Sequence, residues 1–282
     1  MKGAALALLL VLATAAGAAP QDNSIAAATN DLQVRVERQL AYGPHAQQRL
    51  DVYLPGQAAG PVLLMVHGGG WRRGDKAMPG VVLAKVRHWT AQGFVVASAN
   101  YRLLPEADPL EQARDVARAL AFVQRKARDW GADAQRVVLM GHSAGAHLVA
   151  LLDADPALAR EQGAQPWRAT VSLDSAALDI PTLMRMRHLP LYDQAFGADP
   201  AFWAAASPLQ RLTPAAPPLL AVCSTRRAIS CAQAEAFRRR AGEVGVRAAV
   251  QPEAKSHAQI DDQLGLPGPY TETVDRWLAS VL

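Results

Sequence analysis

Short apolar runs alternate with stretches of helical periodicity along most of the 282-residue chain. Apolar runs of four to eight residues are typical of buried strands. Strands are predicted at 33–40, 49–54, 62–66, 94–99, 136–140, 169–173, 218–223 and 247–251. Helices are predicted at 80–91, 110–129, 144–152, 232–243 and 270–281. Strands that alternate with helices indicate crossover connections, so we expect an α/β fold with a mostly parallel sheet flanked by helices.

The clearest helical pattern covers residues 110–129. One apolar stripe recurs there at a spacing near 3.6 residues, which predicts a helix with one buried face. The stripe consists of Leu110, Ala113, Val116, Ala117, Leu120, Ala121 and Val123.

Residues 175–216 interrupt the alternation with several prolines and two aromatic stretches, "LMRMRHLPLYD" and "FWAAASPL". We expect a small helical, cap-like excursion between strands 6 and 7. Its large side chains either wall an apolar pocket beyond the strand ends, where ligands bind in such sheets, or only pack the excursion onto the body. The side chains in question are Met184, Met186, Leu189, Tyr192, Phe196 and Trp203.

The first residues do not fit a fold. Lys2, an apolar stretch and small residues up to Ala19 predict a signal peptide over 1–19, although an uncleaved anchor remains an alternative. The apolar stretch is short for a membrane span, so no stable membrane insertion is expected after cleavage. Residues 20–31 are predicted to be loose and 32–282 to form a single domain. The protein would then be periplasmic or secreted.

Composition excludes some functions. The formal net charge is only +4, and no Lys/Arg run is interleaved with aromatic residues, so nucleic-acid binding is not expected. Cys223 and Cys231 are the two cysteines. In an oxidising compartment they could form a disulfide, and two free buried thiols are the alternative. Four-ligand zinc spacing is absent, and no metal site is predicted. The sequence does not indicate an oligomeric state.

The segment "RVVLMGHSAGAHLVAL" (136–151) carries the strongest chemical signal. A predicted strand enters Gly141-His142-Ser143-Ala144-Gly145, and a predicted helix follows at once. This is the strand–turn–helix context of a G-x-S-x-G nucleophile elbow, in which small neighbours allow the strained turn that exposes the serine. Ser143 is therefore the candidate nucleophile. A glycine-rich turn whose serine only caps the helix is the alternative.

A second glycine-rich segment, "HGGGW", follows the strand at 62–66. Acyl transfer needs backbone N–H groups aimed in advance at the developing oxyanion. We expect these donors from Gly69, Gly70 and Ala144, with His67 orienting the loop. The alternative is a turn in which glycines only satisfy the backbone angles.

The motifs "HGGGWRRGDKA", "NYRLLPEA" and "GHSAGA" together resemble the α/β-hydrolase superfamily, more narrowly its secreted carboxylesterase and hormone-sensitive-lipase-like group, with some likeness to arylformamidases. The resemblance covers most of residues 45–282. It implies an eight-stranded sheet and hydrolysis through an acyl-serine without a cofactor. It also implies that the general base follows the last strand, where His257 stands.

The acid of the triad departs from the family pattern. The family places it after the strand at 218–223, but Arg226 and Arg227 stand there, and a guanidinium accepts no hydrogen bond. Asp174 ends the preceding strand in "SLDSAA", which is similar to the "GLDPA" of pancreatic-type lipases. Asp174 is therefore the candidate acid, with an incomplete triad as the alternative. The order Ser143, Asp174, His257 is the one expected for this fold.

The two arginines and Trp71 are candidates for substrate binding. Arg226 or Arg227 could receive a carboxylate on the substrate, or Arg227 could instead pair with a nearby carboxylate of the protein. The sequence thus predicts a serine carboxylesterase that acts on small-molecule short-chain or aryl esters. An amidase or arylformamidase with the same triad, or a catalytically silent binding protein on this scaffold, are the alternatives.

Overall fold

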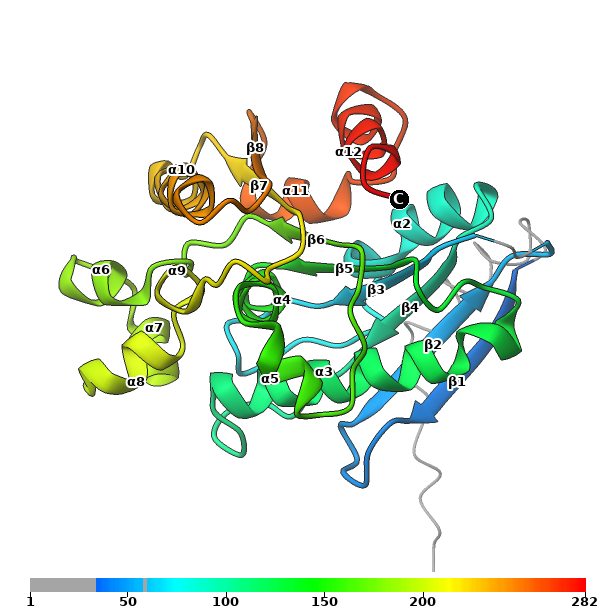
Figure 1. Ribbon diagram of the computed structural model, residues 1–282, viewed down its shortest axis with the longest axis horizontal. Coiled ribbons are helices and arrows are strands. Elements are labelled where there is room, and N and C mark those ends of the chain that lie inside the picture. The colour runs from blue at the N-terminus through cyan, green and yellow to red at the C-terminus, as the bar shows by residue number, and fades with distance from the viewer. Residues whose placement is uncertain (1–33, 58–59) are drawn as a thin grey trace, which may run out of the picture.

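The computed structural model describes residues 34–57 and 60–282, which are built around one eight-stranded sheet (Figure 1). The strands are β1 (Arg35–Ala41), β2 (Arg49–Leu54), β3 (Val62–Val66), β4 (Val95–Ala99), β5 (Val137–His142), β6 (Ala169–Leu173), β7 (Leu219–Ser224) and β8 (Ala248–Glu253). Every predicted strand is present. The predicted signal peptide 1–19 and loose segment 20–31 lie outside the described residues.

The strand order is β1-β2-β4-β3-β5-β6-β7-β8, and β2 pairs antiparallel with both of its neighbours. The strands from β4 to β8 in this order run parallel, as the alternation of strands and helices predicted. The register aligns their carboxyl ends, since Val66 pairs with Gly141, and His142 pairs with Leu173. The residues that follow β3, β5 and β6 therefore leave the sheet at the same edge.

Helices cover both faces of the sheet (Figure 1). Leu63 and Met65 of β3 pack under α2 (Pro79–Ala91) and α12 (Pro269–Ala279), whereas Leu64 and Val66 face α3 (Pro109–Lys126) and α4 (Ala144–Ala154). Successive side chains of a strand point to opposite faces, so an uninterrupted apolar run is what a doubly covered strand requires. α10 (Ala228–Glu243) packs on the α4 side, against β7.

Helix α3 shows how the sequence determines where a helix begins, which face it buries and where it ends. Asp108 caps its first turn, because the carboxylate accepts hydrogen bonds from the Leu110 and Glu111 N–H groups. The apolar stripe is buried against the sheet, apart from Leu110, which is only partly buried. The helix ends earlier than predicted, because the chain tightens into the 3₁₀ turn η1 (Ala127–Trp130) and reverses at Gly131, where φ is 73°.

Four short helices occupy the interval between β6 and β7: α6 (Ile180–Arg185), α7 (Pro190–Phe196), α8 (Pro200–Ala205) and α9 (Pro208–Arg211). Three of them, α7, α8 and α9, begin at a proline, which the first turn of a helix tolerates because its N–H groups have no partner within the helix. Two further short helices, α5 (Pro156–Arg160) and α11 (His257–Asp262), were not predicted, since five or six residues are too few to display a helical period. Among residues 34–57 and 60–282, no helix has the length and apolar character to cross a membrane.

Candidate active site

Ser143 stands on a strained turn between β5 and α4, with φ 55° and ψ −113°. The glycines on either side of it are required for steric reasons, because a Cβ on Gly141 would lie 2.4 Å from the Gly145 carbonyl oxygen. A Cβ on Gly145 would lie 2.3 Å from the Val66 carbonyl oxygen. The segment therefore has the strand–turn–helix geometry that the sequence predicted for a nucleophile elbow.

His257 is the first residue of α11 and approaches Ser143 from the loop after β8. Its Nε2 lies 2.9 Å from Ser143 Oγ. The start of α11, which carries this ring, is fixed by a capping box, in which Ser256 and Gln259 each bond to the other's backbone N–H. The His257 side chain is 37% exposed, so the imidazole is open to the cavity.

Asp174 follows β6 directly and contacts the second ring nitrogen of His257. Its Oδ2 lies 2.6 Å from His257 Nδ1, and its side chain is fully buried. The residue has a positive φ of 55°, which turns the carboxylate off the strand axis. The Asp174 N–H still bonds to the Val222 carbonyl at 2.8 Å, so the backbone continues the β6–β7 ladder. The structure thus brings together the three predicted residues.

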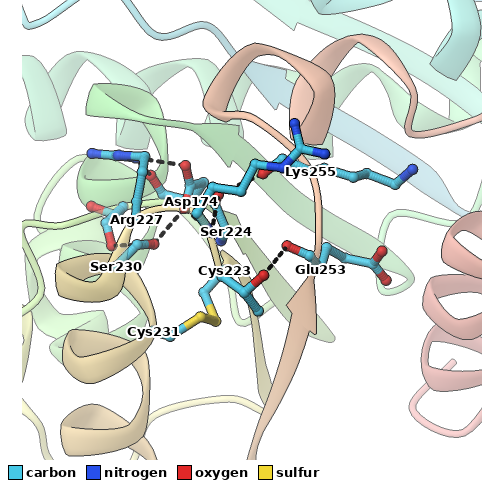
Figure 2. The surroundings of a disulfide bond; sticks show 11 residues. Asp174, Cys223, Ser224, Arg227, Ser230, Cys231, Glu253 and Lys255 are labelled. Carbon is cyan, nitrogen blue, oxygen red and sulfur yellow. Dashed lines mark hydrogen bonds and ion pairs between the residues drawn. A yellow bond between two sulfur atoms is a disulfide. The ribbon is translucent and has the colours of Figure 1, made fainter.

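The Asp174 carboxylate receives four donors. Oδ1 accepts from the Ser224 N–H at 2.8 Å and from Ser230 Oγ, while Oδ2 accepts from Arg227 Nη1 at 2.6 Å (Figure 2). Oδ2 also faces His257 Nδ1. Burial by itself raises the pKa of Asp174. The hydrogen bonds and the Arg227 charge outweigh burial, and the pKa of this carboxyl falls well below its usual range. Asp174 is therefore ionised at neutral pH.

The predicted oxyanion donors surround Ser143. Gly69 and Gly70 take φ values of 117° and 62°, and among the described residues neither N–H is paired with an acceptor. A Cβ on Gly68 would stand 2.9 Å from Ser143 Cβ, so this loop passes directly over the serine. Ala144 is the first residue of α4, where an N–H has no partner within the helix.

His67 orients this loop, as the sequence suggested. Its Nδ1 lies 2.7 Å from the Gly68 carbonyl, and its ring stacks on Tyr101 with centroids 4.5 Å apart. The Tyr101 hydroxyl donates to the His67 carbonyl at 3.0 Å. Burial lowers the pKa of His67, so the ring is neutral.

A cavity of about 1120 Å³ opens above Ser143 and His257. Leu189, Leu191 and Tyr192 of the excursion line it together with the oxyanion loop. The other large side chains of the excursion do not: Met184 and Phe196 are buried in the core, Met186 is exposed, and Trp203 donates to the Gly197 carbonyl. Both alternatives weighed for the excursion are thus realised, by different residues.

Trp71 only borders the cavity. Its side chain is 3% exposed, and its ring meets Tyr192 and Phe196 edge-on, with centroids 5.9 and 5.0 Å apart. Its Nε1 donates to His147 Nδ1 at 3.3 Å. The main contacts of Trp71 therefore join the oxyanion loop to the excursion, and a role in substrate binding stays a prediction.

The two arginines differ in their surroundings. Arg227 bonds to Asp174, which is the alternative that the sequence left open, although its side chain also lines the cavity. Arg226 is exposed, lies outside the cavity wall, and reaches Gln259 Oε1 at 3.5 Å. The predicted disulfide between Cys223 and Cys231 is present, with Cα atoms 5.0 Å apart.

His142 is a neighbour of the site to which sequence reasoning gave no role. Its Nε2 lies 3.0 Å from the His257 carbonyl oxygen, and the two rings are 4.4 Å apart. Burial lowers the pKa of His142 to about 4, so its neutral ring donates from Nε2 and supports the backbone of His257. The signal was its place as the middle residue of Gly141-His142-Ser143. Among the described residues, no group of three His, Cys, Asp or Glu side chains is arranged to hold a metal ion.

The chain is similar to a family model and to several known proteins. A family model described as BD-FAE matches residues 50–164, which include the oxyanion loop and Ser143 but end before Asp174. Esterase LipC of Mycobacterium tuberculosis is 31% identical over 207 residues, covering 67% of this chain and 50% of that protein. The isoprenylcysteine alpha-carbonyl methylesterase of Arabidopsis thaliana is 36% identical over 121 residues, covering 41% of this chain and 27% of that protein.

The chain thus spans half or less of the length of these two curated relatives. Among solved structures, esterase B of Lactobacillus rhamnosis superposes with a TM-score of 0.70 at 22% identity, covering 92% of this chain and 91% of that one. That likeness concerns the fold. Together with the eight-stranded sheet and the elbow, the matches show that the chain has the α/β-hydrolase fold and that the proteins it resembles are esterases.

Proposed function

We propose that the protein is a serine carboxylesterase in which Ser143 is the nucleophile, His257 the general base and Asp174 the triad acid. One observation carries the proposal: Ser143 Oγ, the His257 ring and Asp174 Oδ2 form one continuous hydrogen-bonded row, with steps of 2.9 and 2.6 Å. Distances of this size permit proton transfer between the serine and the imidazole. The esterase relatives support the same class of reaction.

The row suggests the following mechanism. With its proton on Nδ1, where Asp174 accepts it, His257 can take the Ser143 proton at Nε2 while Oγ attacks the ester carbonyl carbon. The N–H groups of Gly69, Gly70 and Ala144 would then receive the oxyanion. His257 returns the proton to the leaving alcohol, and an acyl-serine remains. A water molecule, deprotonated by the same imidazole, releases the carboxylic acid.

The cavity supports short-chain or aryl esters as substrates. Its volume of about 1120 Å³ accommodates a small ester, and Leu189, Leu191 and Tyr192 supply apolar and aromatic surface near the nucleophile. We propose export through the first 19 residues as well, which sequencing the N-terminus of the mature protein would test.

The decisive experiment compares Ser143→Ala with wild type. A fluorophosphonate probe should label the wild-type serine, and p-nitrophenyl acetate should be cleaved, while Ser143→Ala should lose both. Ser280→Ala is a matched control, because Ser280 is an exposed serine at the end of α12. Labelling or turnover that survives Ser143→Ala would contradict the proposed nucleophile. Failure of the wild type in both assays would favour a silent binding protein.

A further inference from the structure

Three of the four donors to Asp174 come from a single short segment. Ser224, Arg227 and Ser230 all lie between Cys223 and Cys231, the two cysteines of the disulfide (Figure 2). In the family pattern this turn would carry the acid itself. Here it surrounds an acid that belongs to the neighbouring strand.

We propose that the disulfide-closed segment 223–231 is a positioning element for the triad acid, and that Arg227 is its positioning residue. Arg227 would fix the Asp174 carboxylate and at the same time oppose protonation of His257. The inference rests on the proposed function, and it adds a role that the catalytic row itself does not require.

Arg227 Nη1 occupies an unusual place between acid and base. It lies 2.6 Å from Asp174 Oδ2 and 3.1 Å from the Asp174 carbonyl oxygen, but also 2.7 Å from His257 Nδ1. When Nδ1 carries the proton that Asp174 accepts, Arg227 cannot donate to it. The N–H groups of Arg227 and His257 then converge on the same oxygen, Oδ2.

This arrangement has an electrostatic consequence. A second positive charge on the imidazole would stand beside the guanidinium, so Arg227 disfavours the imidazolium that Asp174 favours. The other ionisable groups that face His257 affect its charge less. His142 is neutral, and the carboxylate of Asp261, behind His142, is paired with Lys85 at 2.7 Å. Tyr192 is neutral too, because burial raises its pKa. Among the residues that the structure describes, Arg227 is therefore the cation that acts on His257 at shortest range.

The disulfide fixes both ends of the segment. Cys223 lies in β7, and Cys231 lies in the first turn of α10. The segment is also tied to the loop that carries His257, because Ser224 Oγ donates to the Lys255 carbonyl at 2.5 Å and the Thr225 N–H donates to the Glu253 carbonyl at 2.9 Å. The acid and the base are thus held by one braced segment.

The test measures kcat and kcat/KM for neutral p-nitrophenyl acetate from pH 4 to 9. The variants of the full chain are Arg227→Gln and Arg227→Met, which remove the charge, and Arg227→Lys, which keeps it. Arg239→Gln is the control for an equal charge change on the exposed side of α10, and Ser143→Ala reports on the proposed function. Circular dichroism establishes that each variant is folded, and the second neutral variant serves if the first does not fold.

In both neutral variants the acid limb of kcat/KM should move to higher pH, because a neighbouring like charge disfavours the charged form of a group and the variants remove that charge. The plateau kcat should fall roughly 10- to 100-fold through loss of alignment, with KM nearly unchanged. Arg227→Lys should keep the limb near its wild-type position. A neutral variant whose acid limb stays at the wild-type position overturns the positioning role. So does one in which KM rises while kcat is unchanged. Activity that survives Ser143→Ala overturns the proposed function instead.

Discussion

Asp174 Oδ2 lies 2.6 Å from His257 Nδ1, although Asp174 follows β6, His257 follows β8, and β7 stands between these strands. The gap is bridged because α11, which packs against β7, begins at His257. The carboxylate reaches the ring from one strand away, with a positive φ at Asp174. A carboxylate at the end of β6 can thus contact an imidazole that follows β8.

Replacing Asp174 with Asn should leave the fold intact and lower kcat by about four orders of magnitude, because an amide fixes the wrong tautomer of His257. Steady-state turnover of p-nitrophenyl acetate measures the loss. Asp179→Asn is a matched control, since Asp179 caps α6 and Asn caps a helix equally well. Losses of less than tenfold in Asp174→Asn would show that another group orients the imidazole.

The sequence was sufficient for all eight strands and for the three residues that the structure joins in one hydrogen-bonded row, Ser143, His257 and Asp174. Buried parallel strands are uninterrupted apolar runs, and the elbow motif fixes the strand–turn–helix order around Ser143. Asp174 could be selected because it ends a strand and because Arg227 cannot accept a hydrogen bond.

Other features depend on distances between elements that are remote in sequence. Arg227 could be recognised as a poor acid, but its contact with Asp174 follows from the β6–β7 pairing. The bond between His142 and the His257 carbonyl joins residues 115 positions apart. α11 was missed because its six residues show no period, and its capping box at Ser256 and Gln259 was the available signal.

Gly145→Ala should destabilise the protein severely, because the added Cβ would lie 2.3 Å from the Val66 carbonyl oxygen and 2.4 Å from that of His67. Both obstacles are backbone atoms that cannot rotate away. Gly242→Ala in α10 is the matched control. No atom lies within 4 Å of its added Cβ, so alanine there should stabilise the helix by about 0.5–1 kcal/mol. Urea denaturation of both variants measures the difference, and equal stability would contradict the steric argument.

Replacing both cysteines of the disulfide with alanine should lower the free energy of unfolding by about 2.5 kcal/mol. The two residues are 8 positions apart, and the entropy of closing so short a loop in the unfolded chain gives this size. We expect kcat to fall as well, because the two ends of the segment that holds Asp174, in β7 and α10, are then no longer linked to each other. Denaturation and turnover are measured on the same samples. A variant with lowered stability but wild-type kcat would separate the disulfide from the site.

The pH dependence of stability should reveal His147, which lies fully buried between Trp71 and the Ala206 carbonyl. Burial lowers the pKa of His147 to about 4, whereas an unfolded histidine titrates near 6.5. Between these pH values the unfolded chain binds one more proton, so the free energy of unfolding falls as the pH falls. The slope from this group is at most about 1.4 kcal/mol per pH unit.

His147→Gln should therefore lower stability at pH 7 but flatten its decline between pH 6.5 and 4, as measured by urea denaturation at each pH. His188→Gln provides the opposite sign. The bond to Asp193 raises the pKa of the partly buried His188, so its stabilisation is present at low pH and is lost as the pH rises through the raised value. Removing His188 should make the decline toward low pH steeper. If His147→Gln declines as steeply as wild type, His147 takes up its proton in the folded state, and the Trp71–His147 hydrogen bond cannot be the one described.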